Sequence, residues 1–225
     1  MHASTRLCVV SALCLSATLV MSGCEEGGQS ASAKATPVTT AAATPAASAS
    51  QRPVIVVPAP GAVEAVIAGG TGFAVGAGMM TTRVLYVLFD PQCPHCGRLW
   101  ETTKPLLGDI RVVWLPVAFM SAKSAPQGAA ILSAENPQAA MDAHEALLSQ
   151  NRVGMDAPAN PDPALLAKIR ANTTLWKTLK GESVPFIVFK DLVSGQSSTI
   201  AGELETEQLR TLMRLQFTAA GPAAK

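Results

Sequence analysis

Two cysteines separated by two residues, in the segment Cys93-Pro94-His95-Cys96, are the side chains of this sequence best suited to chemistry. The sequence holds five cysteines in all. Cys8 and Cys14 lie in an N-terminal apolar segment that we expect to be removed, and Cys24 lies where a lipoprotein signal has its acylated residue. Cys93 and Cys96 are therefore the pair expected to remain as free thiols. A C-x-x-C spacing fits either a redox pair or half of a zinc site.

A structural zinc site is the first alternative for this pair. Such a site needs four ligands, usually supplied as two C-x-x-C or Cys/His pairs. Besides the two cysteines, the chain after residue 24 offers only His95, inside the motif, and His144 as further nitrogen or sulfur ligands. We interpret His144 as a solvated residue of a helix. The sequence therefore predicts no metal site, and we expect no cofactor.

The residues around the motif favour a reactive thiolate at Cys93. Asp90-Pro91 ends an apolar run, Pro94 suits the first turn of a helix, and the residues after Cys96 continue that helix. Cys93 is then at a helix N-terminus, where free N–H groups and the helix dipole stabilise negative charge. His95 adds positive charge or a hydrogen bond, and solvent access acts in the same direction. We expect the pKa of Cys93 to be well below the free-thiol value of about 8.5.

Cys96 completes the redox interpretation. It follows Cys93 by three residues on the same helical face, close enough for disulfide geometry. It can then attack a mixed disulfide formed at Cys93. We assign Cys93 as the nucleophile and Cys96 as the resolving thiol of a redox-active disulfide, with Pro94 and His95 tuning the thiolate.

The N-terminus predicts export. Arg6 precedes an apolar stretch over residues 7–20 that is too short to span a bilayer, and Met21-Ser22-Gly23-Cys24 resembles a lipobox. We predict that residues 1–23 are a removed lipoprotein signal and that Cys24 is lipidated. A plain secretory signal cleaved nearby is the alternative, and both deliver the protein to a compartment where disulfides persist. We expect a lipid-anchored periplasmic protein. Glu25 favours the outer membrane by resemblance to enterobacterial lipoproteins.

Residues 24–52 are rich in Ala, Ser, Thr, Pro and Gly, with almost no large apolar side chain. Such a segment buries too little surface to offset the entropy of ordering, so we predict a flexible tether. Removing the signal takes Arg6 from the 17 basic residues and leaves a formal charge of zero against the 16 acidic residues. This balance argues against a nucleic-acid partner and against electrostatic membrane binding. The lipid at Cys24 is the expected membrane contact.

Residues 53–219 are long enough for one domain with a sizeable core, and we expect a disordered tail over residues 220–225. Apolar runs predict strands at 54–57, 73–75, 84–89, 110–119, 185–190 and 197–201, with a glycine turn at 69–72. Helical spacing predicts helices after the cysteine motif and at 126–134, 137–150, 163–180 and 203–217. The helices at 126–134 and 137–150 form an inserted helical layer. The pattern as a whole predicts an α/β domain.

The segment from Phe89 to Trp100, FDPQCPHCGRLW, resembles the active site of the DsbC/DsbG family of periplasmic thiol-disulfide isomerases, and DsbG more than DsbC. The likeness continues at Ala129–Leu132 and Val184–Ile187, and it covers about residues 84–216. It implies a thioredoxin fold with a helical insertion, in which helices flank a central mixed β-sheet. It also implies that Pro185 is a cis-proline facing the active-site disulfide, and that Val184 and Pro185 contact the substrate. An ordinary trans proline that begins an edge strand is the alternative.

The sequence departs from this family in two respects, and from thioredoxins in a third. DsbC/DsbG proteins carry an N-terminal dimerisation domain, whereas here only a signal, a tether and short strands are expected before residue 84, so we expect a monomer. Pro94-His95 and Val184 resemble the oxidase DsbA, which is expected to make the disulfide more oxidising. The buried acid that thioredoxins carry six residues before the nucleophile is replaced by Val87. We interpret the nearby Asp90 as a turn or helix-capping residue.

Three functions follow from these observations. The first is a DsbG-like reductase or isomerase acting on cysteines or disulfides of exported proteins, supported by an unidentified membrane redox partner. The second is a DsbA-like oxidase that donates its disulfide. The third is a non-catalytic binding or assembly lipoprotein in which the cysteine pair is incidental or holds a metal transiently.

Overall fold

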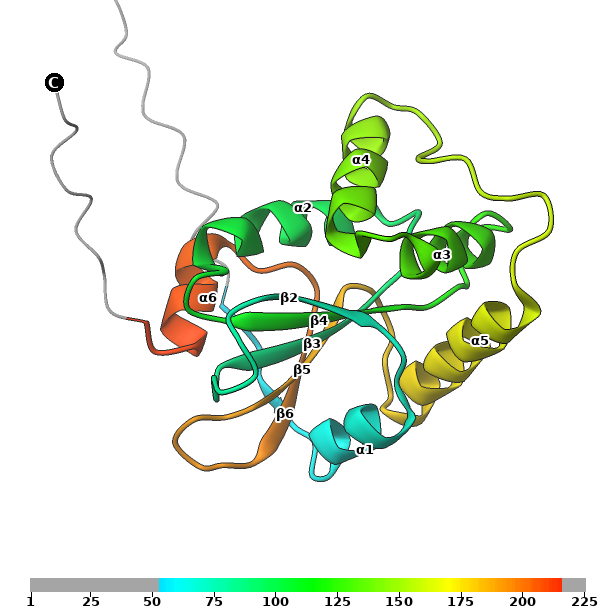
Figure 1. Ribbon diagram of the computed structural model, residues 1–225. Coiled ribbons are helices and arrows are strands. Elements are labelled where there is room, and N and C mark those ends of the chain that lie inside the picture. The colour runs from blue at the N-terminus through cyan, green and yellow to red at the C-terminus, as the bar shows by residue number, and fades with distance from the viewer. Residues whose placement is uncertain (1–52, 216–225) are drawn as a thin grey trace, which may run out of the picture. The chain divides into compact units, whose positions relative to one another are not determined.

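The computed structural model describes residues 53–215, which fold around a six-stranded mixed sheet (Figure 1). The predicted signal, Cys24, the tether and the tail all lie outside the described residues. The strands are β1 (Val57–Pro58), β2 (Phe73–Gly76), β3 (Val84–Phe89), β4 (Arg111–Pro116), β5 (Phe186–Lys190) and β6 (Ser197–Ala201).

The strand order of the sheet brings two distant segments together. The order is β1-β6-β5-β3-β4-β2, in which β3 and β4 run parallel and the other neighbours run antiparallel. Because β3 and β5 are antiparallel, the end of β3 lies beside the beginning of β5, with Leu88 opposite Phe186. The cysteine motif after β3 therefore meets Val184 and Pro185 before β5.

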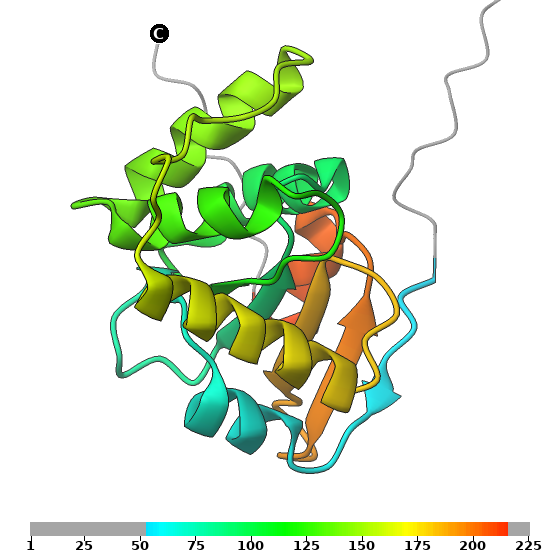
Figure 2. The ribbon, with the colours of Figure 1, turned by 90° about the vertical axis from the view of Figure 1, so that its right-hand side faces the viewer.

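Helices cover both faces of the sheet (Figures 1 and 2). α1 (Ala62–Gly69) and α5 (Pro163–Thr178) pack on one face. α2 (Pro94–Thr103), the short 3-10 turn η2 (Lys104–Leu106) and α6 (Thr206–Leu212) lie together on the other. The predicted inserted layer is α3 (Ser124–Ser133) and α4 (Pro137–Ser149), which follow β4. Among residues 53–215, no helix is long and apolar enough to cross a bilayer.

α2 buries one stripe of side chains against an aromatic cluster. Cys96, Leu99, Trp100 and Thr103 recur at helical spacing, and all are buried. The Trp100 and Trp114 rings meet edge to face with centroids 5.2 Å apart. Phe89 meets Trp114 in the same way at 5.6 Å. Such pairs add about 0.5–1.5 kcal/mol beyond burial, so the helix that begins at the cysteine motif is held firmly on β3 and β4.

The helix α1 corrects the sequence prediction, which had only short strands and a glycine turn between residues 53 and 80. Valine-rich sequence favours strands, but here Val63 and Val66 lie three residues apart and are buried against the sheet, while Ile67 is 63% exposed. Glu64 accepts hydrogen bonds from Lys190 and from the Ser197 hydroxyl. These contacts with β5 and β6 stabilise a helix that local propensity does not predict.

Three predicted boundaries were also wrong. β1 is limited to Val57–Pro58. β4 ends at Pro116, before the predicted residue 119. α6 starts at Thr206 because Glu205 and Gln208 form a capping box ahead of it, and within the described residues it ends at Leu212.

Candidate active site

The cysteine motif lies at the junction of β3 and α2. Cys93 is the N-cap of α2 and Pro94 occupies its first turn, as predicted. The Cys93 N–H donates to the Asp90 carbonyl at 2.9 Å, and the Cys96 N–H donates to the Cys93 carbonyl at 3.0 Å. Both cysteines are in the free-thiol form. The turn therefore holds Cys93 at the helix start and Cys96 one turn into the helix.

The Cys93 thiol is acidic, but its surroundings differ from the expectation. Its pKa is lowered to about 6, first by the hydrogen bond from Cys96, then by the Cys96 and His95 backbone N–H groups and the charge of His95, against the opposing effect of burial. The lowered pKa was predicted correctly. The expected solvent access was wrong, because Cys93 is only 2% exposed. The second cysteine contributes more to the acidity than His95 does.

Cys96 has the opposite character. It is 0% exposed, and burial raises its pKa well above the ordinary thiol value. The hydrogen bond to Cys93 and the charges of Cys93 and Glu145 act in the same direction. A reactive thiolate at Cys93 therefore lies beside a thiol that holds its proton tightly.

Val184 and Pro185 face the nucleophile. The Val184–Pro185 peptide bond is cis, as the resemblance implied. The Cys93 Sγ lies 3.4 Å from the Val184 carbonyl oxygen. The two segments that the sheet brings together thus meet at the reactive sulfur.

A polar cluster lies on the exposed side of the motif. Arg98 donates from Nε to Glu203 at 2.6 Å, and its guanidinium lies 2.6 Å from Nδ1 of His95. Partial burial raises the pKa of Glu203, but the hydrogen bonds and charges of Arg98 and His95 together outweigh burial, and the pKa falls. Glu203 comes from the loop before α6, so the orientation of His95 depends on a residue distant in sequence.

Asp90 fastens the loop after β4 to the motif turn. Its carboxylate accepts from the N–H groups of Gln92, Phe119 and Met120 at 2.9–3.0 Å. It also accepts from the Ser124 hydroxyl at 2.6 Å. The predicted turn role of Asp90 is confirmed, and its carboxylate also binds the first residue of α3.

His144 corrects the interpretation of a solvated residue, because it is 0% exposed. Its Nδ1 accepts from the Met155 N–H at 3.2 Å, so its Nε2 donates to the Pro91 carbonyl at 2.6 Å. Burial lowers its pKa, against the bond to Pro91, which raises it. His144 is thus a neutral link between α4 and the motif turn.

Glu145 is the residue near the cysteines that the sequence reasoning missed. It is 6% exposed, and burial raises its pKa to about 8, helped by the charges of Cys93 and Glu101 and opposed by Lys104. A signal was available in the sequence: Met141, His144 and Glu145 share one face of α4, and all three are buried. An acid on the buried stripe of the inserted helix faces the domain.

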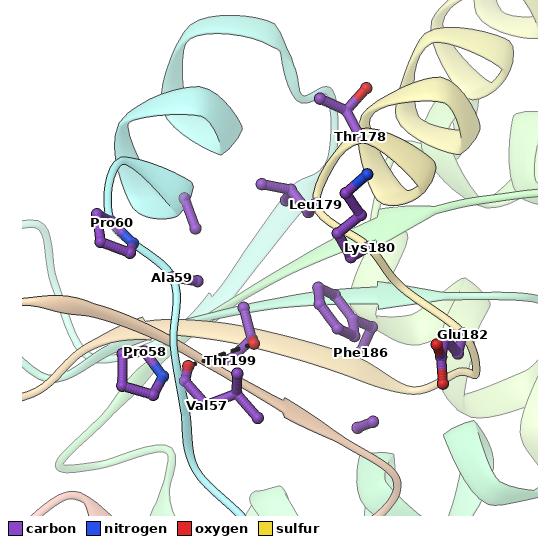
Figure 3. Close-up of a pocket in the computed structure, with 12 residues that line it drawn as sticks. Val57, Pro58, Ala59, Pro60, Thr178, Leu179, Lys180, Glu182, Phe186 and Thr199 are labelled. Carbon is purple, nitrogen blue, oxygen red and sulfur yellow. Dashed lines mark hydrogen bonds between the residues drawn. The ribbon is translucent and has the colours of Figure 1, made fainter.

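A separate groove of about 470 Å³ lies between β1, the start of α1 and the end of α5 (Figure 3). Its walls include Val57, Thr178, Leu179, Phe186 and Thr199. Neither cysteine lines it. Within residues 53–215, no three His, Cys, Asp or Glu side chains gather as metal ligands would.

Comparison with known proteins identifies relatives of this chain by sequence. No protein-family model matches the chain. The thiol:disulfide interchange protein DsbG of Pseudomonas aeruginosa is 25% identical over 134 residues, which are 58% of this chain and 51% of that protein. DsbG of Escherichia coli is 27% identical over 108 residues, 47% and 43% of the two chains. The chain thus spans about half the length of the curated relatives it matches.

Solved structures establish the fold. The catalytic domain of Proteus mirabilis ScsC matches with a TM-score of 0.53 at 22% identity, over 68% of this chain and 92% of that domain. A periplasmic thioredoxin-like protein from Salmonella enterica serovar Typhimurium matches with a TM-score of 0.53 at 20% identity, over 68% and 94% of the two chains. The predicted thioredoxin fold and the predicted likeness to DsbG are confirmed.

Proposed function

We propose that this DsbG-like chain is a thiol-disulfide oxidoreductase of the cell envelope that acts through Cys93 and Cys96. One observation carries the proposal: two adjacent thiols have pKa values shifted in opposite directions at a helix N-terminus that faces a cis-proline. A low-pKa thiol is an effective nucleophile and leaving group at neutral pH. The neighbouring thiol stays protonated and does not react until it attacks the mixed disulfide.

In the direction that reduces a client, the reaction proceeds by two exchanges, and an oxidase runs the same two exchanges in reverse. The Cys93 thiolate attacks one sulfur of a client disulfide, so a Cys93–client bond forms while the other client sulfur leaves as a thiolate and takes a proton. Cys96 then loses its proton and attacks Cys93. The Cys93–Cys96 bond forms and the second client sulfur leaves. The client is reduced and the chain is oxidised by two electrons.

We assign supporting roles to the residues around the pair. Pro94 and His95 tune the thiolate, since the His95 N–H and charge both lower the pKa of Cys93. Val184 and Pro185 bind the extended client backbone beside the reactive sulfur, 3.4 Å from the Val184 carbonyl.

The direction of transfer has two candidates. The resemblance of the segment from Phe89 to Trp100 to the DsbC/DsbG isomerases favours a reductase or isomerase. A Cys93 pKa of about 6 favours an oxidase, because a stabilised thiolate makes the disulfide more oxidising. The redox state of the pair in cells, measured by an alkylation mass shift, distinguishes them: a mainly reduced pair supports the first, and a mainly oxidised pair the second.

We propose the periplasm as the location, with exported proteins bearing cysteines or disulfides as clients and an unidentified membrane redox partner. Lipidation of Cys24 would anchor the chain through residues 24–52. Labelling with radioactive palmitate that is lost in Cys24→Ala supports the anchor, and labelling that persists contradicts it. The monomeric state stays a prediction, which sedimentation of the chain checks.

Trapping of mixed disulfides tests the proposed function. Cys93→Ser should abolish reduction of a peptide disulfide. Cys96→Ser should accumulate a mixed disulfide through Cys93, detected by mass, because the second exchange is lost. Equal trapping by both variants would contradict the assignment of the nucleophile.

A further inference from the structure

Glu145 lies against the cysteine motif, and no residue between 53 and 215 forms an ion pair with its carboxyl group. It projects from α4 onto α2, where Oε2 occupies the space that a side chain at position 97 would need, so a Cβ at Gly97 would overlap it. Oε1 is buried, and no hydrogen-bond donor among the described residues reaches it. A carboxyl group in this position costs free energy when ionised, so burial alone gives no reason for an acid here.

The charged groups around Glu145 leave it unneutralised. Lys104 is the cation that lowers its pKa, but the Lys104 ammonium is bound 2.7 Å from both Glu101 and Asp142. The adjacent His144 is neutral, because each of its ring nitrogens is engaged with the backbone. Glu101 and the Cys93 thiolate add negative charge. Glu145 therefore holds a proton readily.

Cys96 lies where such a carboxyl group is useful. In the second exchange the Cys96 thiol must lose its proton, yet the residue is 0% exposed and its pKa is raised well above the ordinary value. The charge of Glu145 is one of the causes that raise the pKa of Cys96. Bulk water has little access to the thiol, so the proton needs a nearby acceptor.

We propose that Glu145 accepts the proton of Cys96 when Cys96 attacks the mixed disulfide at Cys93, and returns it when the pair is reduced again. This inference rests on the proposed function. The proton passes from Cys96 Sγ to the Glu145 carboxylate, directly or through one water. The Cys96 electron pair forms the Cys93–Cys96 bond, and the client sulfur leaves with the electron pair of the bond that breaks.

The state of Cys93 sets the state of Glu145. While Cys93 is a thiolate, its charge helps keep Glu145 protonated. In the mixed disulfide that charge is gone, so Glu145 ionises more readily at the step that needs an acceptor. The bond from His144 to Pro91 holds this part of α4 beside the motif turn.

A rapid reaction of the reduced mature chain with dithiobisnitrobenzoate separates the two exchanges. Attack by Cys93 releases the first coloured thiolate at a rate proportional to reagent concentration. Attack by Cys96 releases the second at a rate independent of reagent concentration. Cys96→Ser must lack the second phase, which identifies it.

Glu145→Gln should slow the second phase about 100-fold at neutral pH, within the usual range for general base catalysis. The first phase should stay within about twofold, because Cys93 is already mostly ionised at pH 7 with a pKa of about 6. In the unaltered chain the second phase should accelerate with pH, with a midpoint between the ordinary glutamate value of 4.5 and about 8. In Glu145→Gln this midpoint should disappear, and the rate of the second phase should rise with pH without levelling off, because Cys96 then ionises only through its own raised pKa.

Two further variants separate proton transfer from charge and from structure. Glu101→Gln removes one negative charge from an exposed position near Glu145, and it should leave both phases within about twofold. Glu145→Asp keeps the acid, and it should retain the acceleration with pH at an intermediate rate.

The outcomes distinguish this inference from the proposed function. A second phase unchanged in rate and pH profile in Glu145→Gln would overturn the inference alone. So would equal slowing in Glu101→Gln, or an Asp variant that is as slow as the Gln variant and also lacks the midpoint. Loss of the first phase in the unaltered chain would overturn the proposed function itself.

Discussion

Two carboxylates flank the cysteine pair, and their surroundings differ. Glu203, on the loop before α6, has a side chain that is 28% exposed and bound by Arg98. Glu145, on α4, is 6% exposed, and its Oε1 has no donor among the described residues. The pKa of Glu203 is lowered, whereas that of Glu145 is raised to about 8. Two glutamate carboxyl groups near one site thus have pKa values on opposite sides of the ordinary glutamate pKa.

The difference lies in what compensates each charge. A paired, partly solvated carboxylate stays ionised at neutral pH and can only orient its neighbours or tune their charge. A buried carboxyl group without a counterion changes its protonation near neutral pH and can carry a proton. Glu203 is therefore suited to adjusting the charge around the Cys93 thiolate. Glu145 is suited to exchanging a proton with Cys96.

The largest expected effect is on stability as a function of pH. The folded-state pKa of Glu145 lies above its unfolded value of 4.5, so the unfolded chain releases this proton first and stability falls as pH rises from about 4.5 to about 8. In the unaltered chain this decrease in the free energy of unfolding is on the order of a few kcal/mol across the window, and Glu145→Gln should not show it. Urea unfolding in a Cys93→Ser background measures it without the opposing titration of Cys93. A pH profile identical with and without Glu145 would remove the basis of the comparison.

A second prediction tests the contact between α4 and α2. Gly→Ala within a helix normally stabilises by about 0.5–1 kcal/mol, but a Cβ at Gly97 would overlap the Glu145 carboxylate. Gly97→Ala should therefore destabilise the chain by about 1–3 kcal/mol. In a Glu145→Ala background, Gly97→Ala should destabilise the chain much less, because the overlapping carboxylate is gone. Urea unfolding of the four chains gives the coupling, and additive effects would contradict the contact.

A third prediction ranks the causes of the acidity of Cys93. The hydrogen bond from Cys96 is the largest cause, and the charge of His95 is a smaller one. Cys96→Ala should raise the pKa of Cys93 by an amount on the order of one pKa unit or more. His95→Leu should raise it by less. Thiolate absorbance during a pH titration measures both. A larger shift in His95→Leu would mean that the exposed side dominates the thiolate.

The smallest expected effect belongs to the exposed ion pair. Glu203→Gln should cost about 0.2–1 kcal/mol at neutral pH, less at high salt, because the Arg98 partner is 54% exposed. The sign with pH is opposite to that of Glu145: the stabilisation is present above the unfolded pKa of Glu203 and is lost as pH falls through its lowered folded value. Urea unfolding at two salt concentrations checks it. A cost above about 2 kcal/mol would show that this side is not solvent-screened.

The nucleophile environment was largely predictable because its determinants are local. The apolar run before Asp90, the proline at the first helical turn and the cysteine spacing together predicted a strand, a turn and a helix, and all three are present. The cis bond before Pro185 was implied by resemblance to a known family, and it is also present. The helix α1 was not predictable in this way, since its valines favour strands until Val63 and Val66 meet the sheet.

The inner wall of the site could not be inferred from local rules. The sequence reasoning looked for an acid six residues before Cys93 and found Val87, which is fully buried in β3. The acid beside the motif comes instead from α4, 49 residues after Cys96. The spacing of Met141, His144 and Glu145 puts them on one face of α4, a signal that the sequence prediction did not use. Spacing alone also does not state which surface covers that face.

The sequence by itself determined where the thiols lie, which of them begins a helix and which family the segment resembles, because these properties depend on neighbours within a few residues. Only the tertiary structure decided how each charge is compensated. The neutral link at His144 depends on the packing of α4 against the motif turn. Among the described residues, the lack of a donor to Glu145 Oε1 depends on the packing of α4 against α2. The cost of a charge is set by the solvent and partners around it, and those are properties of the assembled domain.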